Sequence, residues 1–304
     1  MINRDLQKFL IKWFASSKLN RLHENYGGGR IFSDPIIGVA KGDDPIIQKF
    51  KEVVASDHLS PLELWSFEGK KTISSSNLRI VSIIFPYVDK VRKESKNIIE
   101  LPRVILPAEI YSVGRNYANE FKQETCRQVI NFLKEEGYNT VSGMLSEAFS
   151  IRTKGRFYST WSERHYAFAA GLGTFSLSEA LITEAGCNVR IASIVTDAPL
   201  EITHRKSDDP FANCLYYAKG TCRKCQENCP GKAIDQDGHN KNKCYAYGQK
   251  VGRKMNLRIG SILKPHRRHI DGEWKDQKPP VGCAFCQFSV PCMNTNPVKE
   301  KKKG

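Results

Sequence analysis

The chain lacks a long apolar run and is poor in acidic side chains. Its 304 residues carry 47 Lys and Arg against 32 Asp and Glu, which gives a formal net charge of +15. The longest apolar stretch, at residues 80–88, contains Ser82 and Pro86 and falls well short of the roughly 18 residues that a membrane-spanning helix needs. Because 40% of the residues are apolar, a disordered or fibrous chain is excluded as well. We expect a soluble protein of one large or two modest domains.

The N-terminus lacks the uninterrupted apolar segment of a secretory signal, because Asp5, Lys8 and Lys12 interrupt it. Its apolar side chains recur at helical spacing, namely Leu6, Phe9, Leu10, Trp13 and Phe14. We therefore expect an amphipathic helix that docks on the rest of the protein, and a cytoplasmic location. In a reducing compartment, the ten cysteines are expected to serve metal binding or catalysis rather than disulfides.

Cysteines and charges are distributed unevenly along the chain. Cys126 and Cys187 stand alone, whereas the other eight lie between residues 214 and 292. Residues 201–304 hold 21 basic and 10 acidic side chains and so carry +11 of the total charge. With a turn-rich segment at residues 203–213, these shifts predict a domain boundary. We expect an N-terminal helical and extended region at 1–75 that packs on the core, a central domain at 76–205, and a basic, cysteine-rich domain at 206–304.

Local patterns in the first two parts predict both strands and helices. A β-branched run at residues 78–86 predicts a strand that is buried on both faces. Residues 119–136 predict a helix with Asn119 as its N-cap and Gly137 as its stop, and residues 161–170 predict a second helix. Residues 181–186 and 188–197 predict two strands that form a hairpin around Gly186. This mixture indicates an α/β or α+β sandwich, and periodicity does not choose between the two.

The eight clustered cysteines follow a ferredoxin-like spacing. Cys222, Cys225 and Cys229 form a Cys-x2-Cys-x3-Cys run followed by Pro230, which is the second half of the bacterial ferredoxin signature. Eight thiolates suffice for two [4Fe-4S] clusters, which need such soft ligands. Because the last cysteine of the run serves the other cluster, we predict two ligand sets. One set comprises Cys214, Cys222, Cys225 and Cys292, and the other comprises Cys229, Cys244, Cys283 and Cys286.

Structural zinc is the alternative interpretation of these cysteines. The Cys-x2-Cys pairs at 222/225 and 283/286 would suit a zinc ribbon, but the other four clustered cysteines would then have no role. Cys126 and Cys187 lie outside the pattern, and we predict that they are small buried apolar side chains.

Residues 241–268 are strongly basic and contain no acid. The cations are Lys241, Lys243, Lys250, Arg253, Lys254, Arg258, Lys264, Arg267 and Arg268. Three interpretations remain open: docking of an acidic, low-potential electron donor such as a ferredoxin or flavodoxin, binding of a nucleic acid such as tRNA, or solvated cations that offset the negative charge of two clusters.

Three further segments resemble a known family. They are GRNYANEF at residues 114–121, SERHYAFAAGLGTFSLSEALI at 162–182 and VTDAPLE at 195–201. Together with the cysteine block they resemble the epoxyqueuosine reductases and the related reductive dehalogenases over roughly residues 76–298. The resemblance implies a nitroreductase-like, corrinoid-binding α/β sandwich followed by a ferredoxin-like module with two [4Fe-4S] clusters.

The resemblance also implies site residues. The corrinoid would lie against Ala170, Gly171, Leu172, Gly173, Thr174 and Phe175, where small residues let the backbone approach a large flat ligand. The alternative is that Gly171 only ends a helix.

Three side chains are catalytic candidates. Tyr117 is a candidate proton donor, with a core tyrosine as the alternative. Glu163 and Arg164 are candidates too, with a structural ion pair between them as the alternative. The chain departs from the family at residues 174–177, where Trp-Ile-Gly-Lys is usual, and it lacks the acidic proton-donor segment before the Glu-Arg pair.

On this basis we expect a cytoplasmic, cobalamin-dependent iron-sulfur oxidoreductase of anaerobic metabolism. Electrons would pass from a low-potential donor through two clusters to a corrinoid that reduces an organic substrate. The alternative is a ferredoxin-like electron-transfer protein, or a reductase of a partner's corrinoid or flavin, without substrate chemistry of its own. The two differ in whether the chain binds an organic cofactor.

Overall fold

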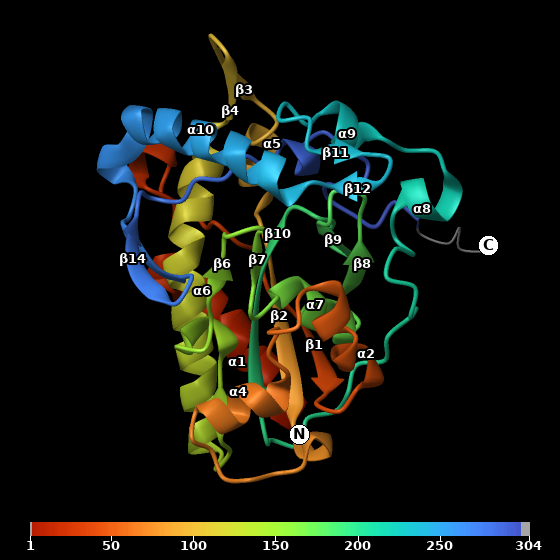
Figure 1. Ribbon diagram of the computed structural model, residues 1–304. Coiled ribbons are helices and arrows are strands. Elements are labelled where there is room, and N and C mark those ends of the chain that lie inside the picture. The colour runs from red at the N-terminus through yellow and green to blue at the C-terminus, as the bar shows by residue number, and fades with distance from the viewer. Residues whose placement is uncertain (1, 299–304) are drawn as a thin grey trace, which may run out of the picture.

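A four-stranded antiparallel sheet forms the centre of the mixed α/β fold (Figure 1). The computed structural model describes residues 2–298. The strand order is β1 (Ile36–Lys41), β2 (Arg79–Pro86), β10 (Val189–Thr196) and β5 (Thr140–Val141). Strands β2 and β10 pair over eight residues, whereas β5 contacts only the end of β10, at Val195 and Thr196. The strand predicted at residues 78–86 is thus confirmed.

The remaining elements surround this sheet. The α-helices are α1 (Ile2–Ser16), α2 (Pro45–Gln48), α3 (Phe50–Val53), α4 (Pro61–Phe67), α5 (Asp89–Glu94), α6 (Glu109–Glu135), α7 (Glu163–Ala169), α8 (Leu215–Lys219), α9 (Lys224–Glu227) and α10 (Lys241–Ile259). The 3-10 helices are η1 (Lys18–Asn20), η2 (Glu24–Tyr26), η3 (Ser75–Asn77), η4 (Gly143–Leu145), η5 (Gly260–Ile262) and η6 (Phe285–Gln287). The strands outside the central sheet are β3 (Ile98–Leu101), β4 (Val104–Pro107), β6 (Ile151–Arg152), β7 (Tyr158–Ser159), β8 (Gly173–Phe175), β9 (Leu181–Thr183), β11 (Ile234–Asp235), β12 (Gly238–His239), β13 (His266–Ile270) and β14 (Glu273–Gln277).

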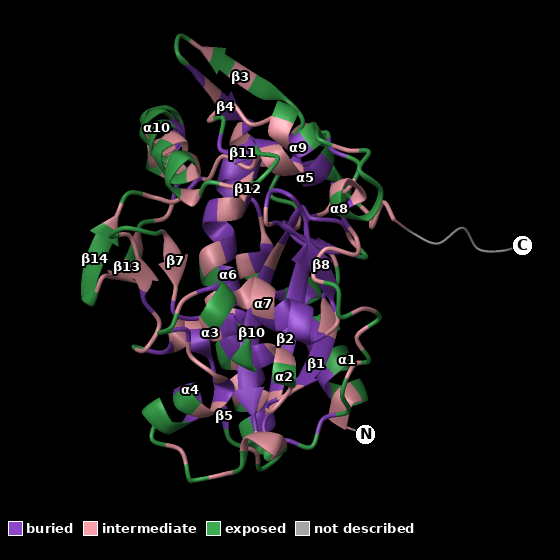
Figure 2. Ribbon diagram, turned by 45° about the vertical axis from the view of Figure 1, so that its right-hand side comes forward, coloured by how far each residue is buried: buried purple, intermediate pink, exposed green. Residues whose placement is uncertain are grey.

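Both faces of the central sheet are buried, because β2 and β10 are apolar on both faces. Successive residues of a strand point to opposite faces. Val81 and Ile194 therefore belong to the core on one face, which α1 and α6 cover. Ile80 and Val195 belong to the core on the other face, which α7 covers. Figure 2 shows that burial concentrates around β2, β10 and α6, whereas α10, β3 and β14 are largely exposed at the periphery.

The long helix α6 begins ten residues earlier than the sequence predicts. It starts at Glu109, so Asn119 lies inside the helix and is not its N-cap. Residues 110–118 include Ile110, Val113 and Ala118, which are buried in the core beneath the sheet. Packing of this face outweighs the local preference of Asn119 for a cap, since tertiary burial supplies most of a helix's stability in proteins. The predicted stop is confirmed, because Gly137 follows the helix with a φ of 88°.

The predicted hairpin between residues 181–186 and 188–197 is wrong. Strand β9 pairs with β8, and β10 pairs with β2 and β5. Gly173 explains the first pairing, because a Cβ there would come within 3.1 Å of the Thr183 Cα on the partner strand. The apolar character of β10 on both faces explains the second, because only the centre of the sheet buries both.

The cysteine-rich segment gathers at one end of the molecule, where α8, α9, α10, β11 and β12 lie together (Figure 1). It shares a core with the rest of the chain, since Val251 and Met255 of α10 join the same apolar cluster as Leu10 of α1. Residues 203–213, the predicted boundary, contain no helix or strand. Residues 299–304 of the predicted third domain lie outside the described residues.

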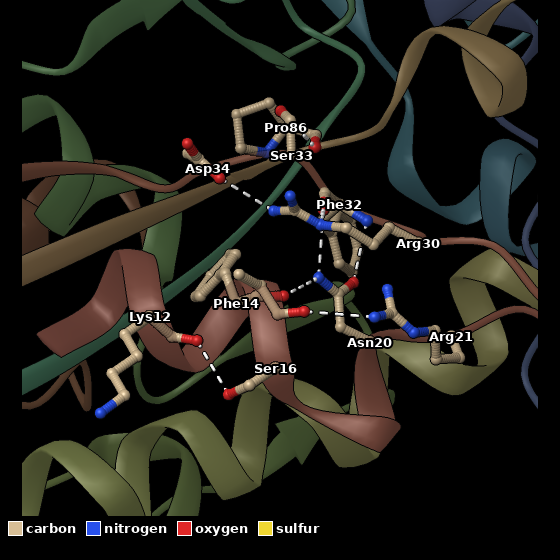
Figure 3. A network of polar contacts seen from close by, with 11 residues as sticks. Lys12, Phe14, Ser16, Asn20, Arg21, Arg30, Phe32, Ser33, Asp34 and Pro86 are labelled. Carbon is tan, nitrogen blue, oxygen red and sulfur yellow. Dashed lines mark hydrogen bonds and ion pairs between the residues drawn. The ribbon is translucent and has the colours of Figure 1, made fainter. Parts of the chain in front are cut away.

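The N-terminal helix α1 docks as predicted, with Leu6, Leu10 and Phe14 buried. Asn20 fixes the turn that follows and is fully buried. Its Nδ2 donates to the carbonyl oxygens of Phe14 at 2.9 Å and Phe32 at 3.0 Å, and its Oδ1 accepts from the Phe32 N–H at 2.9 Å (Figure 3). One side chain thus ties α1 to the segment that leads into β1. Within residues 2–298, no helix combines the length and the apolar character required to cross a bilayer.

Replacing Asn20 should destabilise the protein. Asn20→Ala leaves one buried N–H and two buried carbonyl groups without this partner, so we expect the free energy of unfolding to fall by about 3 kcal/mol. Urea unfolding followed by circular dichroism measures the loss. The exposed Asn25 provides the control, because Asn25→Ala should change stability by no more than about 0.5 kcal/mol. Equal losses in the two variants would contradict this account of the turn.

Candidate iron-sulfur sites and their surroundings

Short helices and loops place the eight clustered cysteines. Cys214 is the N-cap residue of α8, and Cys225 lies within α9. Cys244 lies in the first turn of α10, and Cys286 lies in η6. The other four, Cys222, Cys229, Cys283 and Cys292, lie in the loops between these elements. Backbone N–H groups at helix starts and in tight loops are free to point at sulfur, as a cluster requires.

The structure brings the eight cysteines together in two sets. In one, burial and, to a smaller extent, the neighbouring thiols of Cys292, Cys214 and Cys222 together raise the pKa of Cys225 to about 12. In the other, burial raises the pKa of Cys283 to about 12, with Cys244 and Cys229 as its neighbouring thiols. Burial also raises the pKa of Cys286, which interacts with all three of these and with Cys225. All of these interactions except the one between Cys286 and Cys225 join members of one predicted ligand set, and the assignment of the ligands stays a prediction.

The described residues contain no ready-made site for a single metal ion. Among residues 2–298, no three His, Cys, Asp or Glu side chains stand close enough together to hold one metal ion. A zinc ion needs all its ligands within about 2.3 Å, whereas a [4Fe-4S] cluster takes four thiolates around a larger body. The raised pKa values of Cys225, Cys283 and Cys286 favour protonated thiols at these three positions in the iron-free chain, so metal binding there must release protons. Iron binding by the eight cysteines stays a prediction.

A ninth cysteine lies beside the first set. The Cys187 Sγ is 3.7 Å from the Cys292 Sγ, and the Cys187 N–H donates to the Cys292 carbonyl oxygen at 2.8 Å. Cys187 is buried, with 3% of its surface exposed. Its position at the start of β10 carries no metal-ligand spacing, so the sequence gives no signal of this contact.

The six residues predicted to lie against a corrinoid are packed against their own chain. Gly171 has a φ of 73° and follows α7, so it ends that helix. A Cβ on Gly171 would lie 3.2 Å from the Arg205 Cα, and one on Gly173 would strike β9. Ala170 and residues 172–175 are buried. The missing side chains therefore accommodate protein backbone, and in this conformation residues 170–175 do not fit a corrinoid cradle.

Tyr117 has its hydroxyl engaged by the backbone. The hydroxyl donates to the Ile262 carbonyl oxygen at 2.8 Å, and the Lys264 Nζ lies 4.6 Å from the ring centroid. Burial raises the pKa of Tyr117, and the charge of Glu120 raises it further. The side chain is 9% exposed and links α6 to η5.

Glu163 and Arg164 point in different directions and form no ion pair with each other among the described residues, contrary to the alternative we considered. Glu163 accepts a hydrogen bond from the Ser193 Oγ at 2.5 Å. Burial raises its pKa to about 7, although the nearby Lys122 ammonium opposes that shift. Arg164 instead donates to the Glu179 carbonyl oxygen. Glu163 is therefore the partner of Lys122.

Four cations form a group that the sequence did not predict, and one of them, Arg115, lies beside Cys283 of the second cysteine set. We call them the cationic cluster, and they are Arg115 and Lys122 of α6, Arg190 of β10 and Arg268 of β13. Arg115 packs directly against Gly282, where a Cβ would lie 2.8 Å from the Arg115 Cζ, and Gly282 precedes Cys283. Arg115 and Lys122 stand seven residues apart on one helix face, which is visible in the sequence. The positions of Arg190 and Arg268 depend on the topology of the sheets, so their proximity to Arg115 is not visible in the sequence.

Much of the basic stretch forms an exposed face of α10. Lys243, Lys250, Arg253 and Lys254 are exposed, and within the described chain they make no side-chain hydrogen bond or ion pair. Others in the stretch are paired, such as Lys241 with Glu179 at 3.2 Å and Arg258 with Glu109 at 2.9 Å. Tyr247 bonds to both backbone groups of Ile105. It therefore anchors α10 to β4.

Comparison with known proteins finds likeness in solved structures only. No known protein-family model matches the sequence, and no curated protein matches it. The epoxyqueuosine reductase of Bacillus subtilis is 17% identical, with 98% of this chain and 68% of that chain covered and a TM-score of 0.44. That of Streptococcus thermophilus is 15% identical, with 99% and 69% covered and a TM-score of 0.49. A catabolic reductive dehalogenase is 15% identical, with 86% of this chain but only 30% of that chain covered and a TM-score of 0.48. The chain is thus similar in structure to both groups, and at these values the likeness concerns the fold.

Iron content should separate the predicted ligands from the other cysteines. Cys229→Ala removes one thiolate from the second set, so we expect anaerobically reconstituted protein to fall from about eight iron atoms to about four. Cys187→Ala is the matched control and should keep about eight, because Cys187 lies outside both sets despite its contact with Cys292. Iron and acid-labile sulfide assays measure both variants. Full iron in Cys229→Ala, or lost iron in Cys187→Ala, would contradict the ligand assignment.

Proposed function

We propose that this chain is an iron-sulfur oxidoreductase of the epoxyqueuosine reductase and reductive dehalogenase type, with two [4Fe-4S] clusters that carry electrons to a buried acceptor. The observation that supports this proposal most strongly is the convergence of eight cysteines into two adjacent sets of four. Cys286 interacts both with its own set and with Cys225 of the other, so electrons would have a short path between the clusters. A chain with one structural metal would need neither the second set nor this adjacency.

The second cluster would face the protein interior. Its loop, at Gly282 and Cys283, contacts Arg115 of α6, and α6 lies along the central sheet. The protein's own contribution is to position the clusters and to tune their potentials through burial and nearby charges.

A corrinoid is the organic acceptor that the family resemblance implies. Such a cofactor supplies a strongly nucleophilic reduced cobalt centre when it is bound. Residues 170–175 do not fit as its cradle in this structure, so we derive no chemical step through it. Their close packing favours a second candidate function, in which the chain is an electron-transfer protein that reduces a corrinoid or flavin held by a partner.

One anaerobic experiment tests the proposal and separates the two candidates. The chain is reconstituted with iron and sulfide, its iron is counted, and it is titrated with cob(II)alamin while visible and EPR spectra are recorded. About eight iron atoms with a perturbed, base-off cobalt signal support a corrinoid-dependent reductase. Eight iron atoms with no change at cobalt support the electron-transfer protein. Bound zinc without iron overturns both.

We further propose that the exposed face of α10 docks an acidic electron donor, such as a ferredoxin or flavodoxin. Lys250, Arg253 and Lys254 present three unpaired positive charges on this face, and α10 carries Cys244 in its first turn. A positive surface next to a cluster raises the rate at which a negative partner associates. Binding of tRNA is the less favoured interpretation, and it predicts steeply salt-dependent association with tRNA instead.

Charge reversal on α10 should slow electron entry. We expect Lys250→Glu/Arg253→Glu/Lys254→Glu to lower the rate of cluster reduction by reduced flavodoxin about ten-fold at low ionic strength, and less at high salt, because screening weakens steering. Anaerobic stopped-flow absorbance measures the rate. The matched control reverses the exposed Arg4, Lys8 and Lys12 of α1, which changes the net charge equally. Equal slowing by both triple variants would show that net charge, and not this face, controls the rate.

A further inference from the structure

The cationic cluster joins three separate elements in the interior. Arg190 precedes Ala192 and Ile194 by two and four residues along β10, and both of these belong to the core beneath α6. Its side chain therefore leaves the sheet on the same face as theirs, which is the side of Arg115 and Lys122. Lys122 reaches the same strand, where its Nζ donates to the Ile191 carbonyl oxygen at 2.9 Å. This edge of β10 is open to side chains, because β5 pairs only with Val195 and Thr196. Arg268 interacts electrostatically with both Arg115 and Arg190.

The charge of this cluster is not balanced within the described chain. Glu163 is the carboxylate that faces Lys122. Arg190 and Arg268 make no side-chain hydrogen bond or ion pair with any described residue, and the Nε atoms of Arg115 and Arg190 are buried without a partner. Arg164 interacts with Arg190 as a further cation and so does not compensate it. The three guanidinium groups of Arg115, Arg190 and Arg268 thus face no carboxylate in the described chain, because Glu163 faces Lys122.

Further buried polar atoms without partners surround the same place. They are the Tyr87 hydroxyl, the Ser112 Oγ, both side-chain polar atoms of Asn188 and the Glu163 Oε1. Ser112 precedes Arg115 by one helical turn, and Asn188 and Tyr87 are neighbours because Val189 pairs with Pro86. With the two arginine Nε atoms, these groups account for seven of the twelve unpartnered buried polar atoms in the described residues. Buried polar groups are almost always paired, so this concentration indicates a missing ligand.

The physical chemistry specifies the charge of that ligand. Burial and repulsion by neighbouring guanidinium groups together lower the pKa of Lys122 to about 7 and that of Arg268 to about 10. Unpaired charges removed from water are costly, and an anion placed between them offsets that cost. A guanidinium group presents a planar fork that matches two oxygens of a carboxylate or phosphate. The partial exposure of Arg115, Arg190 and Arg268 leaves them accessible to such a molecule.

The cluster cysteines do not explain these cations. Arg115 does interact with Cys283 and would offset part of the charge of the second cluster. Arg190, Arg268 and Lys122 interact with none of the eight predicted ligands, and the cysteine near Lys122 is Cys126. Three of the four cations therefore need another negative partner.

We propose that Arg115, Lys122, Arg190 and Arg268 form the binding site of a small organic anion, which carries a carboxylate or phosphate group and is the substrate of the reductase. This inference rests on the proposed function, since Arg115 places the anion beside the loop of the second cluster. Asn188 and Tyr87 supply further hydrogen bonds at the end of β10. The substrate class is thus an organic acid or a phosphate ester.

Binding of simple anions tests the site. Iron-loaded protein is titrated anaerobically with inorganic phosphate and with benzoate by isothermal calorimetry at constant ionic strength. We expect saturable binding of at least one of them, weakened at least ten-fold in Arg190→Gln and Arg268→Gln. Arg267→Gln is the matched control, because Arg267 is the neighbour of Arg268 on β13 but is 67% exposed, and it should bind as the wild type does. Absence of binding in the wild type, or equal affinity in Arg268→Gln and Arg267→Gln, overturns the proposal.

EPR spectroscopy locates the bound anion, and competition with corrinoids identifies which molecule supplies it. Because Arg115 contacts the loop of the second cluster, anion binding should change the EPR spectrum of the reduced protein, and Arg115→Gln should abolish that change while iron content stays at the wild-type value.

Anion binding is then repeated with saturating cobalamin, whose nucleotide loop carries a phosphate, and with cobinamide, which lacks that loop. Anion binding that persists in the presence of each corrinoid supports a substrate site. Loss of anion binding in the presence of either corrinoid overturns that assignment. Loss with cobalamin but not with cobinamide would show that the cations bind the phosphate of the cofactor. The iron count and the cobalt EPR spectrum, both recorded without added anion, test the proposed function independently of the anion site.

Discussion

The eight-residue pairing of β2 with β10 is the constraint on which the rest of the structure depends. Both strands are apolar on both faces, so each face of the sheet must be covered by helices. Helix α6 covers one face and α7 covers the other, and the N-terminal helix reinforces the first. The start of β10 then supports one of the cysteine loops, because residues 186–188 contact residues 292–294. The fold therefore fixes where the predicted clusters lie before any metal enters.

Charge is arranged around the sheet end in two opposed groups. Thiols that would become negative on metal binding lie on one side, and the cationic cluster lies on the other, with Arg115 in contact with both. In water these charges would interact weakly, but burial strengthens each attraction and each repulsion. The arrangement makes the second cysteine set and the cationic cluster electrostatically dependent on one another. Glu163 moderates this field only at Lys122.

Sequence reasoning succeeded where short-range patterns decide the structure. The buried strand β2, the docking face of α1 and the stop at Gly137 follow from local periodicity and from a single residue type. Spacing also predicts two cysteine sets, because a cluster loop is a local motif, and that ligand assignment stays a prediction. It failed at Asn119, where burial of residues 110–118 extends α6. It also failed at the predicted hairpin, because β9 pairs with the preceding strand β8 and β10 pairs with β2, far away in the sequence. The cationic cluster escaped notice for the same reason, since Arg190 and Arg268 meet Arg115 only after the sheet and β13 are in place.

The contact of Cys187 with Cys292 has a consequence for the order of folding. Cys214, Cys222 and Cys225 lie within twelve residues of one another, so a loop of modest length brings three thiols of the first set together at little entropic cost. Cys292 comes from almost seventy residues further on, and its loop is held by hydrogen bonds from the Cys187 and Asn188 N–H groups. The fourth thiol therefore reaches its place only when β10 already stands in the sheet. Contacts of such long range form late in folding. The first cluster could therefore be completed only after β10 has joined the sheet.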